Sequence, residues 1–166
     1  MLWLVPLLAL AALVESVAIP GLLTSGIRPD LVVVLTVARA TLRGWREGLL
    51  AGWIGGLFFD MASAAPFGVN MLRLSLIGLL AGLAMQRLAR TSPLLPIAAA
   101  GVASLSASLL AVLALQAARW AVYWSPTLAG EAVARALLTA GLMAVALPAL
   151  RALEKRATGV LEEGQA

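Results

Sequence analysis

The 166-residue sequence contains no cysteine and no histidine, and only 12% of its residues are charged. Without thiols or imidazoles, the chain has neither disulfide bonds nor thiolate chemistry, and a zinc site of the usual kind is excluded. The only lysine, Lys155, lies near the C-terminus and no phosphate-binding glycine loop precedes it, which excludes an ATPase. No histidine is present to activate a serine. We therefore expect no enzymatic activity, no metal and no cofactor.

In contrast to charged residues, hydrophobic residues are abundant in this sequence. They make up 62% of the sequence, against ~45–50% in soluble domains, and the mean hydropathy is +0.99. A lipid bilayer is therefore the predicted surrounding of most of the chain. The pI of ≈ 11.1 would suggest nucleic acid as partner of a soluble protein. Here the basic residues lie in short loops between apolar segments, where the positive-inside rule accounts for them. We expect no nucleic-acid partner.

Six apolar segments predict an all-α integral membrane protein, a bundle of six transmembrane helices. The first lacks a basic start and contains Glu15, so it is a retained helix rather than a signal peptide. The second is short: from Pro29 to Arg43 a helix spans about 21 Å, less than the ~30 Å hydrocarbon core. It crosses if Arg39 and Arg43 extend to the head groups or if the bilayer thins locally, and is otherwise re-entrant. The segments are Leu2–Leu23, Pro29–Leu42, Gly48–Ala62, Gly68–Leu88, Pro93–Trp120 and Leu128–Leu150.

The basic residues are distributed unevenly between the two sides of this predicted bundle. Eight lie on one side, whereas the loops of the other side carry only Arg28 and Arg119. The positive-inside rule places the side with eight in the cytoplasm, together with both termini. We expect residues 1–150 to form the membrane domain and residues 151–166 a short cytoplasmic tail. The eight residues are Arg39, Arg43, Arg46, Arg87, Arg90, Arg151, Lys155 and Arg156.

Glycines at a spacing of four residues mark the third and fourth segments. This spacing places them on one face of a helix, where they form a groove that another helix can approach closely. In the third segment the series ends at Asp60, shortly before a Pro-Phe-Gly turn at residues 66–68. A closely packed helical hairpin is therefore predicted. Its helix-packing residues are Gly44, Gly48, Gly52, Gly56, Gly78 and Gly82.

Several charged residues lie within the apolar segments, where each costs about 2.5–3.5 kcal/mol on insertion scales. Glu131 and Arg135 have the spacing and order of a favourable intrahelical pair. Asp60 and Arg73 flank the hairpin, which predicts a bridge across it. Glu15 has no local partner and is expected either to find one on another helix or to be protonated. The predicted intramembrane polar cluster comprises Glu15, Asp60, Asn70, Arg73, Glu131 and Arg135.

A series of short motifs occupies residues 28–90. In order, they are Arg28-Pro29-Asp30-Leu31, Leu42-Arg43-Gly44, Glu47-Gly48, Gly55-Gly56-Leu57-Phe58-Phe59-Asp60, Pro66-Phe67-Gly68-Val69-Asn70 and Ile77-Gly78. The series resembles the rod shape-determining protein MreD family. The resemblance implies an inner-membrane component of the cell-elongation machinery (elongasome) of walled bacteria, which serves peptidoglycan synthesis. It implies the partners MreC, MreB, and the RodA glycosyltransferase with its transpeptidase. It also implies a fold similar to the substrate-binding subunits of energy-coupling-factor vitamin transporters.

Two functional interpretations remain open. The first is a non-enzymatic scaffold that holds an MreC-like bitopic membrane protein by helix packing. The second is a small-molecule-binding subunit of a membrane transporter, with a cavity in the outer half of the membrane. A cavity binder is expected to line a pocket with Glu15, Asp60, Arg73 and Arg135. A scaffold is expected to pair these charges with one another and to leave apolar faces for a partner.

Overall fold

The computed structural model describes residues 4–18, 29–62, 67–88, 94–117 and 126–163. Within these residues all regular structure is helical, with six α-helices and one π-helical turn, η1. The prediction of an all-α protein is therefore correct. The elements are α1 (Leu4–Leu13), η1 (Val14–Ala18), α3 (Leu31–Arg43), α4 (Trp45–Ala62), α5 (Val69–Leu88), α6 (Leu95–Ala117) and α7 (Pro126–Glu163).

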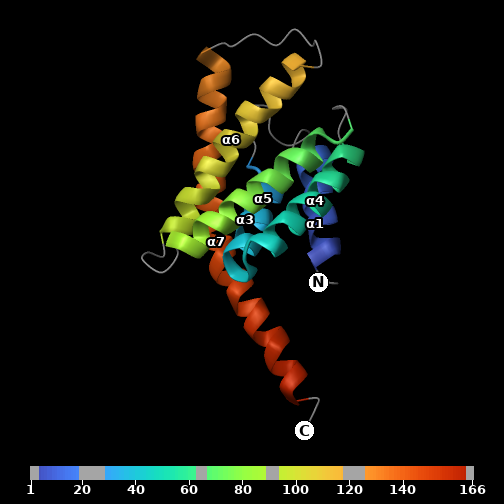
Figure 1. Ribbon diagram of the computed structural model, residues 1–166, viewed down its shortest axis with the longest axis vertical. Helices are drawn as coiled ribbons and strands as arrows, with labels where there is room; N and C mark the ends of the chain where they lie inside the picture. The colour runs from blue at the N-terminus through green and yellow to red at the C-terminus, as the bar shows by residue number, and fades with distance from the viewer. Residues whose placement is uncertain (1–3, 19–28, 63–66, 89–93, 118–125, 164–166) are drawn as a thin grey trace.

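Helix α3 lies at the centre of the molecule and contacts each of the other helices (Figure 1). Most of its residues from Val32 to Ala40 are buried, which explains why this short segment is so apolar. Helices α4 and α5 pack along each other in the most extensive contact of the fold, and α6 packs on α7. The C-terminal part of α7 extends away from the other helices (Figure 1).

The helix bounds differ from the predicted segments mainly at the ends. Pro29 precedes the α3 helix instead of starting it, and Asp30 is the N-cap residue. Helix α4 begins three residues earlier than predicted, at Trp45, because Gly44 with φ 89° ends α3 and turns the chain directly into the next helix. Helix α7 continues to Glu163, so most of residues 151–166 prolong a helix of 38 residues. Trp120, the predicted end of the fifth segment, lies outside the described residues.

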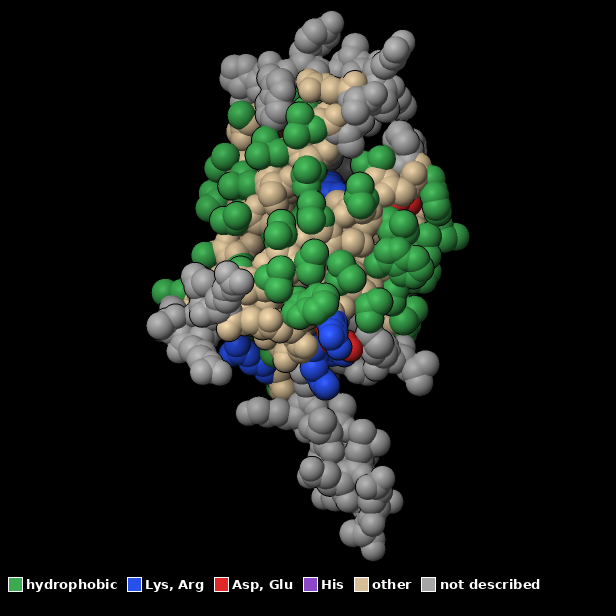
Figure 2. Space-filling view, in the orientation of Figure 1, with side chains coloured by type: hydrophobic (Ala, Val, Ile, Leu, Met, Phe, Trp, Pro, Cys, Tyr) green, Lys and Arg blue, Asp and Glu red, His purple; other side chains and the backbone are tan. Residues whose placement is uncertain are grey.

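Two helices of the described part are long and apolar enough to cross a membrane, judged by length and composition. They contain the stretches Val69–Gln86 and Thr127–Ala152. Shorter apolar helices are Val5–Ser16 and Leu95–Leu110. Apolar side chains cover most of the surface visible in Figure 2, and basic side chains gather toward its lower end. Such a continuous apolar surface is unusual for a water-soluble monomer and is typical of contact with lipid.

Candidate functional site: a buried polar cluster and two cavities

The N-terminus of α3 is the point at which polar side chains of other helices meet. Asp30, only 5% exposed, accepts a hydrogen bond from the hydroxyl of Ser104 on α6. Its Oδ1 lies 3.7 Å from Nη1 of Arg135 on α7, and its backbone N–H donates to Oγ1 of Thr139 at 3.2 Å. These contacts satisfy a carboxylate that would be costly to bury alone. Asp30 therefore joins the α6–α7 pair to the central helix.

Glu15, on η1, binds the same end of α3. Its Oε2 accepts a hydrogen bond from the backbone N–H of Val32 at 3.1 Å. The first N–H groups of a helix have no partner within the helix and carry partial positive charge, so a carboxylate placed there is stabilised. Glu15 thus has its partner on another helix, but this partner is the backbone and not a basic side chain.

The predicted ion pair between Asp60 and Arg73 is wrong. Asp60, which is 4% exposed, accepts hydrogen bonds from the backbone N–H groups of Gly68, Asn70 and Met71 at 2.9–3.1 Å. The side-chain amide of Asn70 donates to it as well, at 2.9 Å. Asp60 therefore caps α5, because the unpaired donors of that helix start lie directly opposite the end of α4. Arg73 instead donates from Nη1 to the carbonyl of Ala107 on α6 at 3.3 Å.

Removing this cap is expected to destabilise the hairpin of α4 and α5. Asp60→Ala leaves several N–H groups at the start of α5 without an acceptor, so we expect a loss of about 2 kcal/mol in unfolding free energy. Asp60→Asn keeps one acceptor oxygen and should lose less. Because Asp60 and Arg73 have separate partners, combining Asp60→Ala with Arg73→Gln should give additive losses. Unfolding titrations in detergent measure the free energy of unfolding of the unaltered protein, of each single variant and of the double variant. A double variant that is no less stable than either of its single variants would contradict this geometry.

The predicted pair of Glu131 and Arg135 is also wrong. Arg135 extends to Asp30, while the side chain of Glu131 is exposed. The buried carboxylate has the greater need of a counter-charge, since leaving it unpaired costs more than leaving an exposed one unpaired. Arg39 is buried, and its Nη2 lies 2.9 Å from Oε2 of Glu47 on α4.

The glycines of α4 lie against the backbone of α5. A Cβ atom added to Gly52 would lie 2.1 Å from the carbonyl oxygen of Leu74, and one added to Gly56 would lie 2.3 Å from Cα of Met71. The two backbones are thus in direct contact, closer than any larger side chain permits. Gly48 and Gly78 approach each other in the same way, Gly82 meets the backbone of Trp45, and Gly44 forms the corner between α3 and α4.

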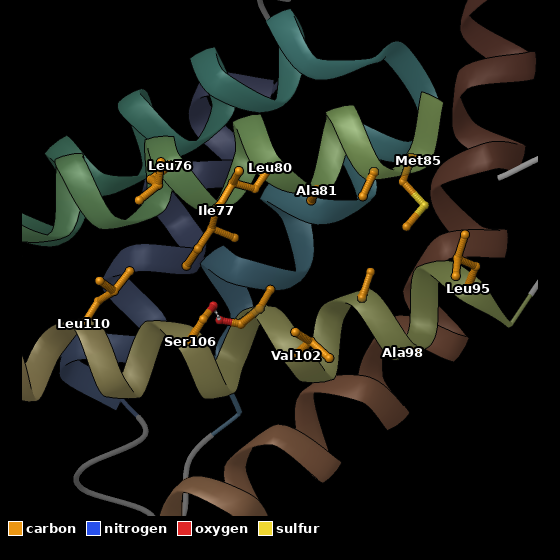
Figure 3. Close-up of a pocket in the computed structure, with 13 residues that line it drawn as sticks. Leu76, Ile77, Leu80, Ala81, Met85, Leu95, Ala98, Val102, Ser106 and Leu110 are labelled. Atoms are coloured by element: carbon orange, nitrogen blue, oxygen red, sulfur yellow. Dashed lines mark hydrogen bonds between the residues drawn. The ribbon is translucent and has the colours of Figure 1, made fainter. Parts of the chain in front are cut away.

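Several cavities open beside α6, among them one of about 320 Å³ between α5 and α6 that Arg73 also lines. Two others are larger. The first is a groove of about 420 Å³ between α5 and α6, into which the side chains labelled in Figure 3 point. Apart from Ser106, its lining is apolar, and small residues such as Ala81, Ala98 and Ala103 form part of it. The second, about 390 Å³, lies between α6 and α7, and Arg73, Glu131 and Arg135 line it.

The charged residues named from the sequence are thus divided between two tasks. Arg73 and Arg135 line the second cavity, whereas Glu15 and Asp60 bind the N-termini of α3 and α5. Within the described residues, no group of three or more acidic side chains is placed to hold a metal ion. Sequence reasoning missed Asp30, Ser104 and Thr139 as members of the cluster. The one available signal in the sequence is an acid, Asp30, at the start of a very apolar segment.

Comparison with known proteins gives one match. Residues 1–145 match the family described as rod shape-determining protein MreD. Neither a curated protein nor a solved structure matches the chain. The match extends over the helices that carry the polar cluster and both cavities, and it confirms the resemblance seen in the motifs of residues 28–90.

Proposed function

Because the chain belongs to the rod shape-determining protein MreD family, a family of membrane proteins with a role in rod shape determination, we propose that it acts as a non-enzymatic scaffold in the inner membrane. The scaffold binds a transmembrane helix of an MreC-like bitopic protein. Through this complex it serves the elongation machinery that synthesises peptidoglycan, with MreB and the RodA glycosyltransferase and its transpeptidase as further partners.

The groove between α5 and α6 is the observation that carries this proposal. It is apolar along its length and is bordered by exposed leucines such as Leu80 (Figure 3). Small residues between these leucines make the groove deeper. Between membrane helices, association depends on close packing, and small residues allow that close approach. A single apolar helix fits such a surface, whereas a polar solute finds almost no hydrogen-bonding groups in it.

The short connections between helices support the same mode of binding. Helices α3 and α4 are separated by Gly44 alone, and no two consecutive described elements are separated by more than 12 residues. With so little chain outside the helices, most of the surface available to a partner lies along the bundle. The glycine faces of α4 and α5 are already occupied by each other. A partner helix is therefore best accommodated beside α6.

We place both termini in the cytoplasm and the bundle of residues 1–150 in the membrane as a multi-pass domain of six spans. The asymmetry of basic residues supports this orientation, as does their gathering toward one end of the apolar surface in Figure 2. The full length of α7, about 57 Å, exceeds the ~30 Å hydrocarbon core, so its C-terminal part reaches beyond the membrane in this arrangement.

A large side chain placed in the groove between α5 and α6 should prevent the partner helix from binding there. Ala98 is exposed and lines the groove, so Ala98→Phe occupies it without entering the buried core. We expect co-purification of an MreC-like protein in mild detergent to fall by about tenfold, as a steric clash of this kind costs 1–3 kcal/mol. Ala144→Phe, on an exposed face of α7, is the matched control and should bind normally.

Equal recovery of the partner with both variants would place the docking surface elsewhere. If no membrane protein is recovered with the unaltered chain and a small solute binds instead, the transport-subunit interpretation replaces the scaffold.

A further inference from the structure

The cavity between α6 and α7 combines charge and apolar surface in an unusual way. Arg73 reaches it from α5 and Arg135 from α7, so two guanidinium groups lie at one cavity of about 390 Å³. The rest of the lining is mainly aliphatic, with Leu105 and Leu109 on α6 and Val133 on α7. Neither the apolar groove beside α5 nor the capped hairpin brings basic groups and open apolar surface together.

Arg73 has hydrogen-bonding capacity that the protein leaves unused. Its Nε is buried and has no hydrogen-bond partner, and Nη1 makes one long bond to a carbonyl. A buried guanidinium N–H without an acceptor is costly, so a ligand oxygen at this position would be favourable. Arg135 is about a third exposed and its contact with Asp30 is long, at 3.7 Å. It can therefore bind a second acceptor. Two guanidinium groups around one space fit a phosphate particularly well.

The apolar part of the cavity is open to the surroundings. Leu109 and Val133 are each about half exposed, so a hydrocarbon chain lying in the bilayer can contact them and the head of the same molecule at once. Arg135 lies about 12 Å along α7 from Thr127, a depth from which a long basic side chain can extend toward head groups. A free phosphate ion would use only the charged end of this cavity.

Glu131 indicates which other charged group a phosphate-containing ligand of this cavity would carry. It lines the same cavity one helical turn from Arg135, and it is exposed. Asp30 already provides a counter-charge for Arg135, and Glu131 is itself a carboxylate, so a purely anionic head group would add an excess of negative charge. A head group that also carries an ammonium brings a counter-charge for Glu131.

We propose that this cavity is a binding site for a phospholipid whose head group carries a phosphodiester and a primary ammonium. The phosphate accepts hydrogen bonds from Nε of Arg73 and from Arg135, the ammonium lies at Glu131, and an acyl chain lies along Leu105, Leu109 and Val133. The site is separate from the proposed docking groove between α5 and α6, and it does not depend on the scaffold function.

Photolabelling of the purified full-length protein tests this site. The probe is phosphatidylethanolamine with a diazirine in one acyl chain, and phosphatidylglycerol with the same chain is the comparison lipid. We expect the ethanolamine probe to label residues 105–112 and 128–135, mapped by mass spectrometry, more strongly than the glycerol probe does. Excess inorganic phosphate should leave this labelling in place, because the acyl chain contributes to binding.

Four variants test the contributions of Arg73, of the cavity space and of Glu131 to lipid binding, with one control. Arg73→Gln should lower labelling by about tenfold, the effect of losing a charge-assisted hydrogen bond. Ala132→Phe fills the cavity and leaves every charge in place, so it should do the same in a protein that keeps its fold. Glu131→Gln should remove the preference for ethanolamine over glycerol. Arg151→Gln, an exposed arginine away from the cavity, should change nothing.

Three results would overturn the proposal. The first is equal labelling of the unaltered protein and the Ala132→Phe variant, and the second is labelling that maps outside α6 and α7. The third is complete competition by inorganic phosphate, which would identify a phosphate site without a lipid. Co-elution of each variant with the unaltered protein in gel filtration ensures that the comparison is made between folded proteins.

Discussion

Gly52→Ala is expected to destabilise the protein severely although it adds a single carbon atom. The new Cβ would lie 2.1 Å from the carbonyl oxygen of Leu74 and 2.8 Å from the backbone N of Ser75, so α4 and α5 must move apart. They cannot separate at this point alone, because Gly48 and Gly56 hold the same two backbones in contact on either side. We expect a loss of about 3 kcal/mol or more in unfolding free energy, at the upper end of overpacking effects, together with a low folded yield.

A matched glycine on α7 provides the control. Gly141 also lies within a helix, but a Cβ added there meets no atom within 4 Å. Gly141→Ala should therefore leave stability unchanged or raise it by a few tenths of a kcal/mol to 1 kcal/mol, because alanine favours the helix. Thermal unfolding in detergent compares the two variants. If both are tolerated equally, the close contact of α4 and α5 is not needed for folding.

Asp30→Asn should have the second large effect. The substitution keeps the shape of the side chain but removes the negative charge beside Arg135, which then lacks its counter-charge in an apolar environment. Because Arg135 is about a third exposed, the expected loss is below that of a fully buried pair, at about 2–3 kcal/mol. Because Asp30 also binds Ser104 and Thr139, the loss should fall on the attachment of α6 and α7 to α3. Limited proteolysis is expected to show faster cleavage in the α6–α7 pair, and unfolding titrations to show the lower stability.

Two further variants test the same pairing. Combining Asp30→Asn with Arg135→Gln should be no worse than either change alone, since neither charge is then left without its partner. Glu131→Gln, which would be as harmful as Asp30→Asn if Glu131 paired with Arg135, should cost less than about 0.5 kcal/mol because Glu131 is exposed. Strong destabilisation by Glu131→Gln would restore the intrahelical pair expected from the sequence.

The properties that the sequence determined by itself are those that depend on local pattern. The share of apolar residues indicated a membrane protein, and the apolar runs located every helix to within a few residues at most ends. The four-residue spacing of glycines defined one face of α4, because helical geometry relates residues that are close in sequence. The motifs of residues 28–90 resembled the family that the match over residues 1–145 shows. The absence of histidine and cysteine likewise needs no fold to be interpreted.

The partners of the charged residues were decided only by the tertiary structure. Asp30 meets Ser104 and Thr139 across 74 and 109 residues of sequence, and no local pattern relates such positions. The nearest opposite charge in sequence was the wrong partner both for Asp60 and for Arg135. Asp60 accepts hydrogen bonds from N–H groups at the start of α5, and Arg135 lies opposite a buried carboxylate. In a low-dielectric interior a charge pairs with the group that helix packing brings to it, because an unpaired buried group costs more than any local pair near the surface gains.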